Sequence, residues 1–263
     1  MILVYPLRHS WKNIAETGGN MKPEKTLSAE DNLLEIDNIS KNFTLHHQGK
    51  VIHGCRDISL HVGSGEFVGI TGRSGSGKST ILRMIYRTYL PQDGEIRYRS
   101  QAFGWISMNK ATEQQVLYLR RHEIGYVSQF LQVIPRTTAR QIIEQAVRET
   151  GADDEQAQSR AQTMLDHFEL DPDLHDAFPY TFSGGERLRL GIARAMAQRP
   201  RLLLLDEPTA SLDNHSKQKV RDLIEQLKAE GTTMLGIFHD LEFMEGLCDR
   251  EYAMAEGSHV QTN

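Results

Sequence analysis

The chain has 263 residues, enough for one large hydrophobic core or two modest ones. Hydrophobic residues make up 39% and charged residues 25%, which is typical of a globular protein and excludes a disordered or fibrous chain. The formal net charge of -5 disfavours a broadly basic surface for nucleic acid. The longest strongly apolar run, Leu202 to Leu205, is far too short to span a bilayer.

The first half of the chain predicts strands, a loop and a helix. Residues 1–32 show no sustained period, and we expect a flexible tail in which Met21 is an alternative start. Residues 34–39 and the alternating residues 58–62 predict half-buried, antiparallel strands. A buried strand over 67–70 leads into a glycine-rich loop, and a helix is expected over 80–89.

The second half alternates between helices and short apolar runs. Strands are expected over 124–127, 202–205 and 232–238. Residues 137–170 carry apolar positions at helical spacing, and further helices are expected over 186–198 and 216–229. Strands that alternate with helices in this way are typical of an α/β domain with a largely parallel sheet.

The glycine-rich loop, Gly-Arg-Ser-Gly-Ser-Gly-Lys-Ser, matches the phosphate-loop pattern GxxxxGK[ST] in full. Its glycines let backbone N–H groups turn toward phosphate oxygens, and the following helix adds its positive end. Lys78 is expected to reach the β- and γ-phosphates, and the Ser79 hydroxyl to coordinate Mg²⁺. The sequence therefore predicts binding of ATP or a similar nucleotide. The residues expected around the phosphates are Gly72, Arg73, Ser74, Gly75, Ser76, Gly77, Lys78, Ser79 and Thr80.

Two acidic residues follow the apolar run 202–205. At the carboxyl end of a buried strand, Asp206 can hold the hydration shell of Mg²⁺. Glu207, one residue further on, is suited to orienting or deprotonating an attacking water. A pair of acids also ends many strands at a protein surface, but their position after a phosphate loop favours a catalytic role.

A second anion site is predicted at Ser183-Gly184-Gly185-Glu186. A serine hydroxyl and glycine N–H groups at the head of a helix are good phosphate partners. The same four residues also suit an ordinary helix-capping turn. The motifs before and after this segment, taken in their order along the chain, favour the phosphate site over the plain helix cap.

Gln129, Ser183–Glu186, Asp206–Thr209, Ser211–Asp213 and His239 stand in the order found in ABC ATPases. From about residue 33 to its end, the chain resembles an ABC nucleotide-binding domain. The resemblance implies a phosphate-loop core with a mainly parallel sheet, an antiparallel β subdomain and a helical subdomain inserted at about 130–183.

The resemblance also assigns roles to single residues. Gln129 would be a ligand and sensor of Mg²⁺ that couples to the helical subdomain, and His239 would contact the γ-phosphate. Asp213 would belong to the nucleotide site. Phe43 resembles the aromatic residue that stacks on adenine, although a plain core phenylalanine fits the pattern almost equally well.

One chain offers two phosphate sites but only one catalytic glutamate. The resemblance implies a head-to-tail dimer in which Ser183, Gly184 and Gly185 close over the ATP of a second ABC subunit, identical or different. Phe182 and Glu186 replace the leucine and glutamine that usually flank this segment. Residues 187–190 also depart from the family pattern, which leaves the fine contacts of the segment open.

Longer stretches resemble the ABC-type subunit of the bacterial carbon–phosphorus lyase system, the PhnL type. They are residues 89–91, 127–136, 181–186 and 236–240. This resemblance implies a cytoplasmic protein that works with the lyase core complex and supports formation of ribose 1-phosphonate 5-triphosphate. The alternative is the ATP-binding subunit of an importer or lipoprotein-release transporter with separate membrane subunits, a group in which Glu186 also occurs.

Overall fold

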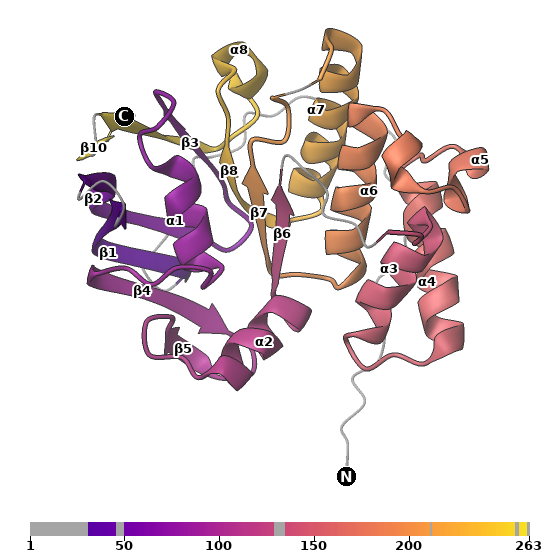
Figure 1. Cartoon of the computed structure of the whole chain (residues 1–263), viewed down its shortest axis with the longest axis horizontal. Helices are drawn as coiled ribbons and strands as arrows, with labels where there is room; N and C mark the ends of the chain where they lie inside the picture. The colour runs from indigo at the N-terminus through magenta and orange to yellow at the C-terminus, as the bar shows by residue number, and fades with distance from the viewer. Residues whose placement is uncertain (1–30, 46–49, 129–134, 211, 256–257, 262–263) are drawn as a thin grey trace, which may run out of the picture.

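Two β-sheets and the helices around them form the centre of the molecule (Figure 1). The computed structural model describes residues 31–45, 50–128, 135–210, 212–255 and 258–261. One sheet has four strands in the order β2-β1-β4-β5, and the other has six in the order β10-β9-β3-β8-β7-β6. The predicted fold class, an α/β cassette with a parallel core and an antiparallel β subdomain, is confirmed.

The four-stranded sheet is antiparallel throughout. It comprises β1 (Asn32–Leu45), β2 (Lys50–Gly63), β4 (Asp93–Ser100) and β5 (Gly104–Ser107). Its first two strands pair Leu34 with Val62 and Ile36 with Leu60, so the alternating apolar side chains of both strands share one buried face. The predicted strands 34–39 and 58–62 are confirmed. Strand β1 begins at Asn32, one residue before the expected domain start.

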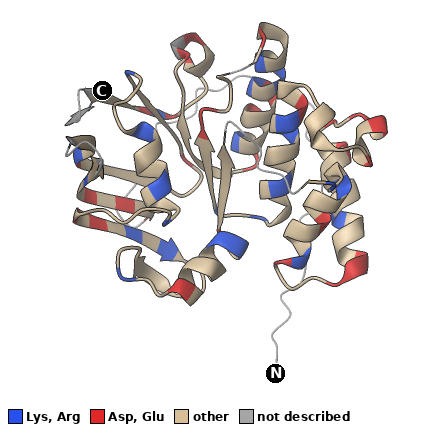
Figure 2. Cartoon of the chain, viewed as in Figure 1, with Lys and Arg blue, Asp and Glu red and all other residues tan. Residues whose placement is uncertain are grey.

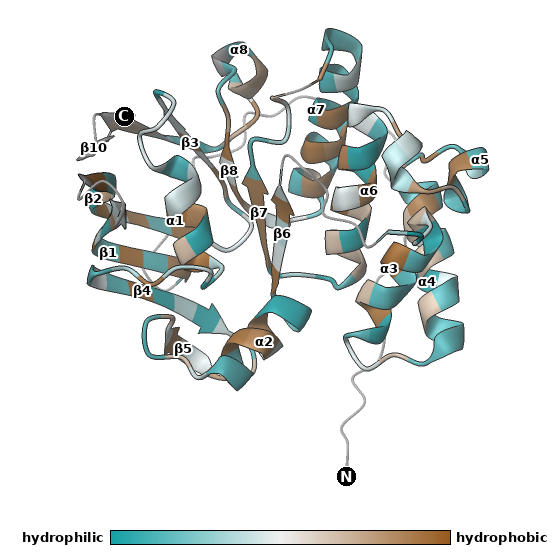
Figure 3. Ribbon diagram, in the orientation of Figure 1, coloured by the Kyte–Doolittle hydropathy of each residue, from teal (hydrophilic) through white to brown (hydrophobic). Residues whose placement is uncertain are grey.

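The six-stranded sheet is parallel except at its β9–β10 edge. Its strands are β3 (Phe67–Gly72), β6 (Ile124–Ser128), β7 (Leu202–Asp206), β8 (Thr233–Ile237), β9 (Arg250–Ala255) and β10 (Ser258–Gln261). Every residue of β7 and β8 is buried, as continuous apolar runs in a covered parallel sheet require. Figure 3 shows these strands as hydrophobic segments at the centre of the molecule.

The helices are α1 (Lys78–Ile85), α2 (Glu113–His122), α3 (Ala139–Arg148), α4 (Asp154–His167), α5 (Pro172–His175), α6 (Gly184–Ala197), α7 (Asn214–Ala229) and α8 (Leu241–Met244). Thr112, Thr138, Asp153 and Ser183 open four of them with a capping box, in which side chain and backbone satisfy each other's free groups. Helices α3, α4 and α5 stand together at one side of the molecule (Figure 1).

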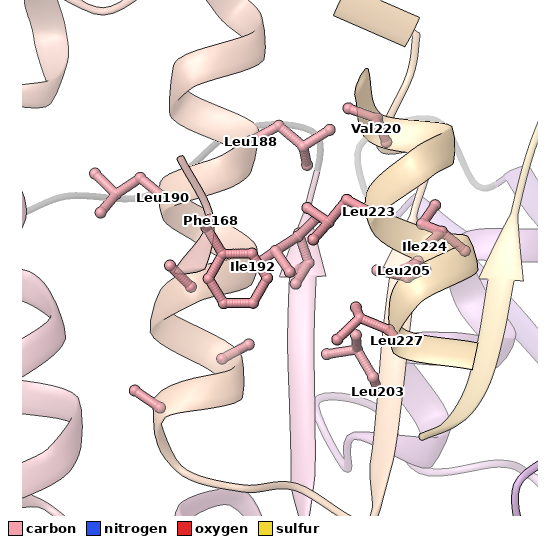
Figure 4. Packing of buried hydrophobic residues seen from close by; sticks show 14 of the residues in the cluster. Phe168, Leu188, Leu190, Ile192, Leu203, Leu205, Val220, Leu223, Ile224 and Leu227 are labelled. Atoms are coloured by element: carbon pink, nitrogen blue, oxygen red, sulfur yellow. The ribbon is translucent and has the colours of Figure 1, made fainter. Parts of the chain in front are cut away.

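Strand β7 divides the buried residues into two clusters. Leu203 and Leu205 belong to the cluster that includes α6 and α7, whereas Leu202 and Leu204 belong to the cluster beneath the antiparallel sheet. Figure 4 shows Leu203 and Leu205 beside Leu227 and other apolar side chains of α7. Each buried leucine side chain contributes about 2 kcal/mol of transfer free energy, so this packing fixes β7 and the residues that follow it.

The expected boundaries of three helices are wrong, and one of these helices is α7, which begins at Asn214 and not at residue 216. Helix α1 runs over residues 78–85 rather than 80–89, because Arg87 adopts a left-handed conformation with φ of 64° that a helix cannot contain. Helix α6 begins at Gly184, two residues earlier than expected, because the capping box places Ser183 at the N-cap. Residues 1–30 of the predicted tail, which was expected to cover 1–32, lie outside the described residues, and so does Gln129.

Candidate nucleotide site

The phosphate loop joins the end of β3 to the start of α1. Gly72, Gly75 and Gly77 have φ angles of 138°, 80° and 95°, a region that side chains other than glycine disfavour. Gly77 is the N-cap of α1, and a Cβ atom there would lie 1.5 Å from the carbonyl oxygen of Gly54. By contrast, a Cβ at Gly75 would meet nothing within 4 Å. The backbone of the loop therefore contacts Gly54 closely at Gly77, whereas the space that a side chain at Gly75 would enter holds no atoms of the described residues.

Polar groups of the loop suit an anion. The Lys78 ammonium is buried and donates to the carbonyl oxygens of Gly72 at 2.7 Å and Arg73 at 2.9 Å. Burial lowers the pKa of Lys78, and the charges of Glu207 and Asp206 act against that effect. The Ser76 hydroxyl is buried without a hydrogen-bond partner among the described residues. Such an orphaned donor needs a partner, and a phosphate oxygen satisfies it.

The remaining predicted loop residues occupy ordinary positions around this cradle. Ser74 is exposed, the Ser76 N–H donates to the Arg73 carbonyl at 3.2 Å, and the Thr80 N–H donates to the Gly77 carbonyl at 3.0 Å in the first turn of α1.

Asp206 and Ser79 form the candidate magnesium position. The Ser79 hydroxyl donates to Oδ1 of Asp206 at 2.8 Å, and the hydroxyl of Tyr126 donates to Oδ2 at 2.6 Å. Asp206 is itself buried at the end of β7. Among the described residues no group of three or more His, Cys, Asp or Glu side chains gathers to hold a metal. A hydroxyl and one carboxylate beside a phosphate loop fit Mg²⁺, which keeps water and takes phosphate oxygens as further ligands.

Glu207 and His239 meet beside the magnesium position. They follow the neighbouring strands β7 and β8, and Nε2 of His239 lies 2.7 Å from Oε1 of Glu207. The backbone of Glu207 is left-handed, with φ of 53°, and its N–H donates to the Ile237 carbonyl at 3.2 Å. Strained backbone of this kind persists only where the surroundings fix it. Both side chains line a cavity of about 450 Å³ on this edge of the sheet.

The segment Ser183–Glu186 opens α6 with a capping box. The Glu186 N–H donates to the Ser183 hydroxyl at 3.3 Å, and the Ser183 N–H donates to Oε2 of Glu186 at 2.7 Å. Gly184 is the first helical residue, and a Cβ at Gly185 would lie 3.0 Å from the Ser216 hydroxyl of α7. The N-termini of α6 and α7 therefore lie side by side.

Asp213 caps the second of these helices. Its Oδ1 accepts a hydrogen bond from the Ser216 N–H at 2.8 Å, and this bond lowers the pKa of the Asp213 carboxyl. Figure 1 shows α6 and α1 on opposite sides of the parallel strands, with β8, β7 and β6 between them. Within one chain the second anion segment is thus separated from the phosphate loop by the sheet.

Phe43 lies close to the phosphate loop but already has a ring partner. Its ring packs edge-on against Tyr89, with centroids 5.2 Å apart, and Nζ of Lys41 lies 5.7 Å from its centroid. A Cβ at Gly54 would meet the Phe43 ring at 2.7 Å, so Gly54 separates that ring from Gly77. Adenine stacking by Phe43 stays a prediction.

The structure adds two residues that the sequence analysis did not identify. Tyr126 contacts Asp206 directly, and Gly54 supports the phosphate loop. Tyr126 is the one residue of 124–127 whose side chain can form a hydrogen bond, and this is the only local signal that distinguishes it. Gly54 has no local signal, because its role comes from a contact with residue 77, far along the chain.

A second cavity, of about 750 Å³, is lined in part by Tyr126 and lies between α1, α2, β6 and α6. Its lining includes five arginines and only one acidic residue, Glu149. Figure 2 shows basic residues on α1, α2 and α6, the helices that border this cavity. The arginines are Arg83, Arg120, Arg121, Arg187 and Arg194.

Comparisons with known proteins agree with this geometry. A family model described as "ABC transporter" matches residues 55–210. The methionine import ATP-binding protein MetN of Streptococcus mutans is 31% identical over 87% of this chain, which spans 64% of that relative. A probable amino-acid ABC transporter ATP-binding protein of Haemophilus influenzae is 33% identical, covering 88% of this chain and 87% of the relative. The L-cystine transport protein TcyN of Escherichia coli is 35% identical, covering 87% and 88%.

Solved structures give the same result. The dimeric bacterial ABC transporter cassette MJ0796 matches with a TM-score of 0.78 and 28% identity, covering 88% of this chain and 99% of the cassette. A second dimeric structure of that cassette, bound to ADP and Pi, matches with a TM-score of 0.77. The fold agrees with that of these cassettes, and the chain belongs to the ABC transporter family, whose ATP-binding domain takes ATP and Mg²⁺.

Proposed function

We propose that this chain is the ATP-hydrolysing subunit of an ABC transporter whose membrane parts are separate chains. The observation that carries the proposal is the convergence of Lys78, Ser79, Asp206, Glu207 and His239 at the carboxyl edge of one sheet. None of the helices in the described part of the chain has the length and apolar content that crossing a bilayer demands. The chain would act on the cytoplasmic side, where ATP is supplied.

The geometry supports an in-line attack of water on the γ-phosphorus. The phosphate loop and Lys78 would hold the β- and γ-phosphates, and Ser79 and Asp206 would hold Mg²⁺, whose positive charge would favour the charge that develops on the phosphate oxygens. Glu207 takes the proton of the water as its oxygen bonds to phosphorus, and the bond from phosphorus to the β–γ bridging oxygen breaks. The products are ADP and inorganic phosphate. The contact between Nε2 of His239 and Oε1 of Glu207 would orient the carboxylate of Glu207.

A dimer supplies what one chain lacks. The Ser183 end of α6 presents a serine hydroxyl and glycine N–H groups, but the sheet separates it from the chain's own phosphate loop. Two chains facing each other head to tail would bring this segment over the partner's ATP. Both solved structures of the related cassette are dimeric, which supports a dimer as such.

The catalytic role of Glu207 has a direct test. The variant Glu207→Gln keeps the shape of the side chain but removes the base, so turnover should fall at least about 100-fold while ATP binding stays near that of the wild type. Phosphate release and binding of a fluorescent ATP analogue measure the two quantities. Turnover close to the wild-type rate in this variant would overturn the assignment.

The relatives supply a substrate class. Their names refer to methionine, L-cystine or amino-acid transport, and we extend that class to this chain: import of an amino acid or a close analogue. A second candidate is the carbon–phosphorus lyase subunit. The resemblance of residues 181–186 and 236–240 favours it, although no relative named above belongs to that system.

The partners distinguish the two candidates. Affinity purification of the native protein with ATP and Mg²⁺, followed by mass spectrometry, should recover membrane permease chains if the transporter assignment is right. Recovery of phosphonate-degrading subunits without a permease would instead establish the second candidate.

A further inference from the structure

Both carboxylate oxygens of Asp206 are held by hydroxyl groups. Oδ1 accepts from Ser79 at 2.8 Å and Oδ2 accepts from Tyr126 at 2.6 Å. The second bond is short, as expected for a hydroxyl donor to an ionised acceptor. It comes from β6, the neighbour of β7, and not from the phosphate loop. Tyr126 thus contacts the magnesium carboxylate from the side opposite to Ser79.

The position of Tyr126 is itself fixed from several directions. In the sheet it pairs with Leu204, two residues before Asp206. Its ring lies 5.0 Å from that of Tyr86, and the guanidinium of Arg120 lies 4.6 Å from the Tyr86 ring. Arg83 forms hydrogen bonds with the side chains of Tyr89 and Tyr126. These contacts leave the hydroxyl little freedom to turn away from Asp206.

We propose that Tyr126 is a positioning residue for the Mg²⁺ site: its hydroxyl fixes Oδ2 of Asp206 so that Oδ1 faces Ser79 and the metal. This inference rests on the proposed ATP hydrolysis. A carboxylate held at one oxygen only can rotate about its terminal bond, and the metal must then select the productive rotamer. The Tyr126 hydroxyl holds the Asp206 carboxylate in one orientation before the metal binds.

A purely space-filling role predicts a different outcome. In that case the ring, packed on Tyr86, would be all that matters, and a phenylalanine would replace Tyr126 without consequence. The variant Tyr126→Phe separates the two roles because it removes a single oxygen. Tyr86→Phe is the matched control: Tyr86 lies in the same ring cluster, but Asp206 accepts its hydroxyl hydrogen bonds from Ser79 and Tyr126 and not from Tyr86.

The experiment compares metal affinity, nucleotide affinity and stability in both variants. For Tyr126→Phe we expect about a tenfold rise in the Mg²⁺ concentration that gives half-maximal turnover. A similar rise is expected in the dissociation constant of Mn²⁺ from a complex with a non-hydrolysable ATP analogue, measured by electron paramagnetic resonance. Binding of the analogue without metal should stay at the wild-type value, and so should all three quantities in Tyr86→Phe.

Two results would overturn the proposal. One is wild-type Mg²⁺ and Mn²⁺ dependence in Tyr126→Phe, and the other is an equal loss in Tyr86→Phe. Melting temperatures of both variants show whether a change reflects folding. The Mn²⁺ measurement does not depend on turnover. If the wild-type protein did not hydrolyse ATP, the proposed function would be wrong, but the Mn²⁺ measurement would still test the role of Tyr126.

Discussion

Gly77 illustrates how a single residue fixes the nucleotide site. Its φ of 95° and its approach to the Gly54 carbonyl leave no room for a side chain. Gly75 shares the positive φ, at 80°, but faces open space. The two glycines thus serve different ends: Gly77 holds the loop against β2, and Gly75 keeps its inner surface clear.

This difference predicts different effects of alanine. Gly77→Ala should destabilise the fold by about 2 kcal/mol or more, because backbone strain and a backbone clash act together. It should also weaken binding of ATP analogues. Chemical denaturation and fluorescence titration measure the two effects.

Gly75→Ala is the control for strain alone. It should cost only about 1 kcal/mol, since the added methyl group meets nothing. Equal losses of stability in the two variants would show that the contact with Gly54 does not matter.

Among the elements, the adjacent N-termini of α6 and α7 form the surface that the proposed dimer would present to a partner chain. Ser183 has two tasks there, as the cap of α6 and as the proposed ligand of the partner's phosphate. Thr138 forms the same kind of capping box at α3, away from any proposed nucleotide contact.

The two tasks can be separated by comparing caps. Ser183→Ala and Thr138→Ala should each lower stability by about 1 kcal/mol, the usual cost of losing an N-cap. Only Ser183→Ala should also reduce ATP turnover. A comparable loss of turnover in Thr138→Ala would mean that helix capping, and not phosphate contact, explains the effect.

Helix α7 also holds the turn that follows β8. Nζ of Lys217 lies 2.6 Å from Oδ2 of Asp240, the residue after His239, while Oδ1 accepts from the Phe243 N–H at 3.1 Å. The bond from Lys217, followed by that from Phe243, lowers the pKa of Asp240. A lowered folded-state pKa adds stability above the unfolded-state pKa, and this stability is lost as the pH falls through the folded-state pKa.

Lys217→Met should therefore lower the melting temperature by about 1–3 °C at pH 7, the effect expected of a partly exposed ion pair. The difference from the wild type should begin to shrink below about pH 4 and disappear once the pH has fallen through the lowered folded-state pKa of Asp240, because the carboxylate is then protonated in both proteins. Lys219→Met, an exposed neighbour on α7, is the control. A melting difference that did not change with pH would exclude the ion pair as its cause.

Most of the parallel core could be predicted because its signals are local. Continuous apolar runs identified β7 and β8, and the glycine pattern identified the loop before α1. Strands β4, β5, β9 and β10 and helix α2 were not predicted. In α2 only Val116 and Leu119 are buried, too few for a clear period, and β9 forms by pairing with β3, far away in sequence. Tyr126 was missed for the same reason: it belongs to the site through its contact with Asp206, a residue 80 positions away in the sequence.

At the scale of the whole molecule, the arrangement requires a second chain. Figure 1 shows α1, which follows the phosphate loop, and α6, which begins after Ser183, on opposite sides of the parallel strands. A symmetric pair would contain two composite sites, each built from the phosphate loop of one chain and the α6 end of its partner. The central claim is that hydrolysis takes place in such a composite site.

Mixing two inactive variants tests this claim most directly. Glu207→Gln removes the base, and Ser183→Arg blocks the segment that closes over the partner's ATP. Each variant alone should be inactive. In a mixed dimer one site combines both defects, but the other has an intact Glu207 and an intact Ser183. Half of the dimers in an equal mixture are mixed and each has one intact site of two, so turnover should recover to about a quarter of the wild-type rate.

The measurement is ATP turnover of the equal mixture, with mixed dimers verified by co-purification of two different affinity tags. Recovery toward that level is the predicted result. Mixed dimers that form but show no more turnover than either variant alone would contradict the composite site.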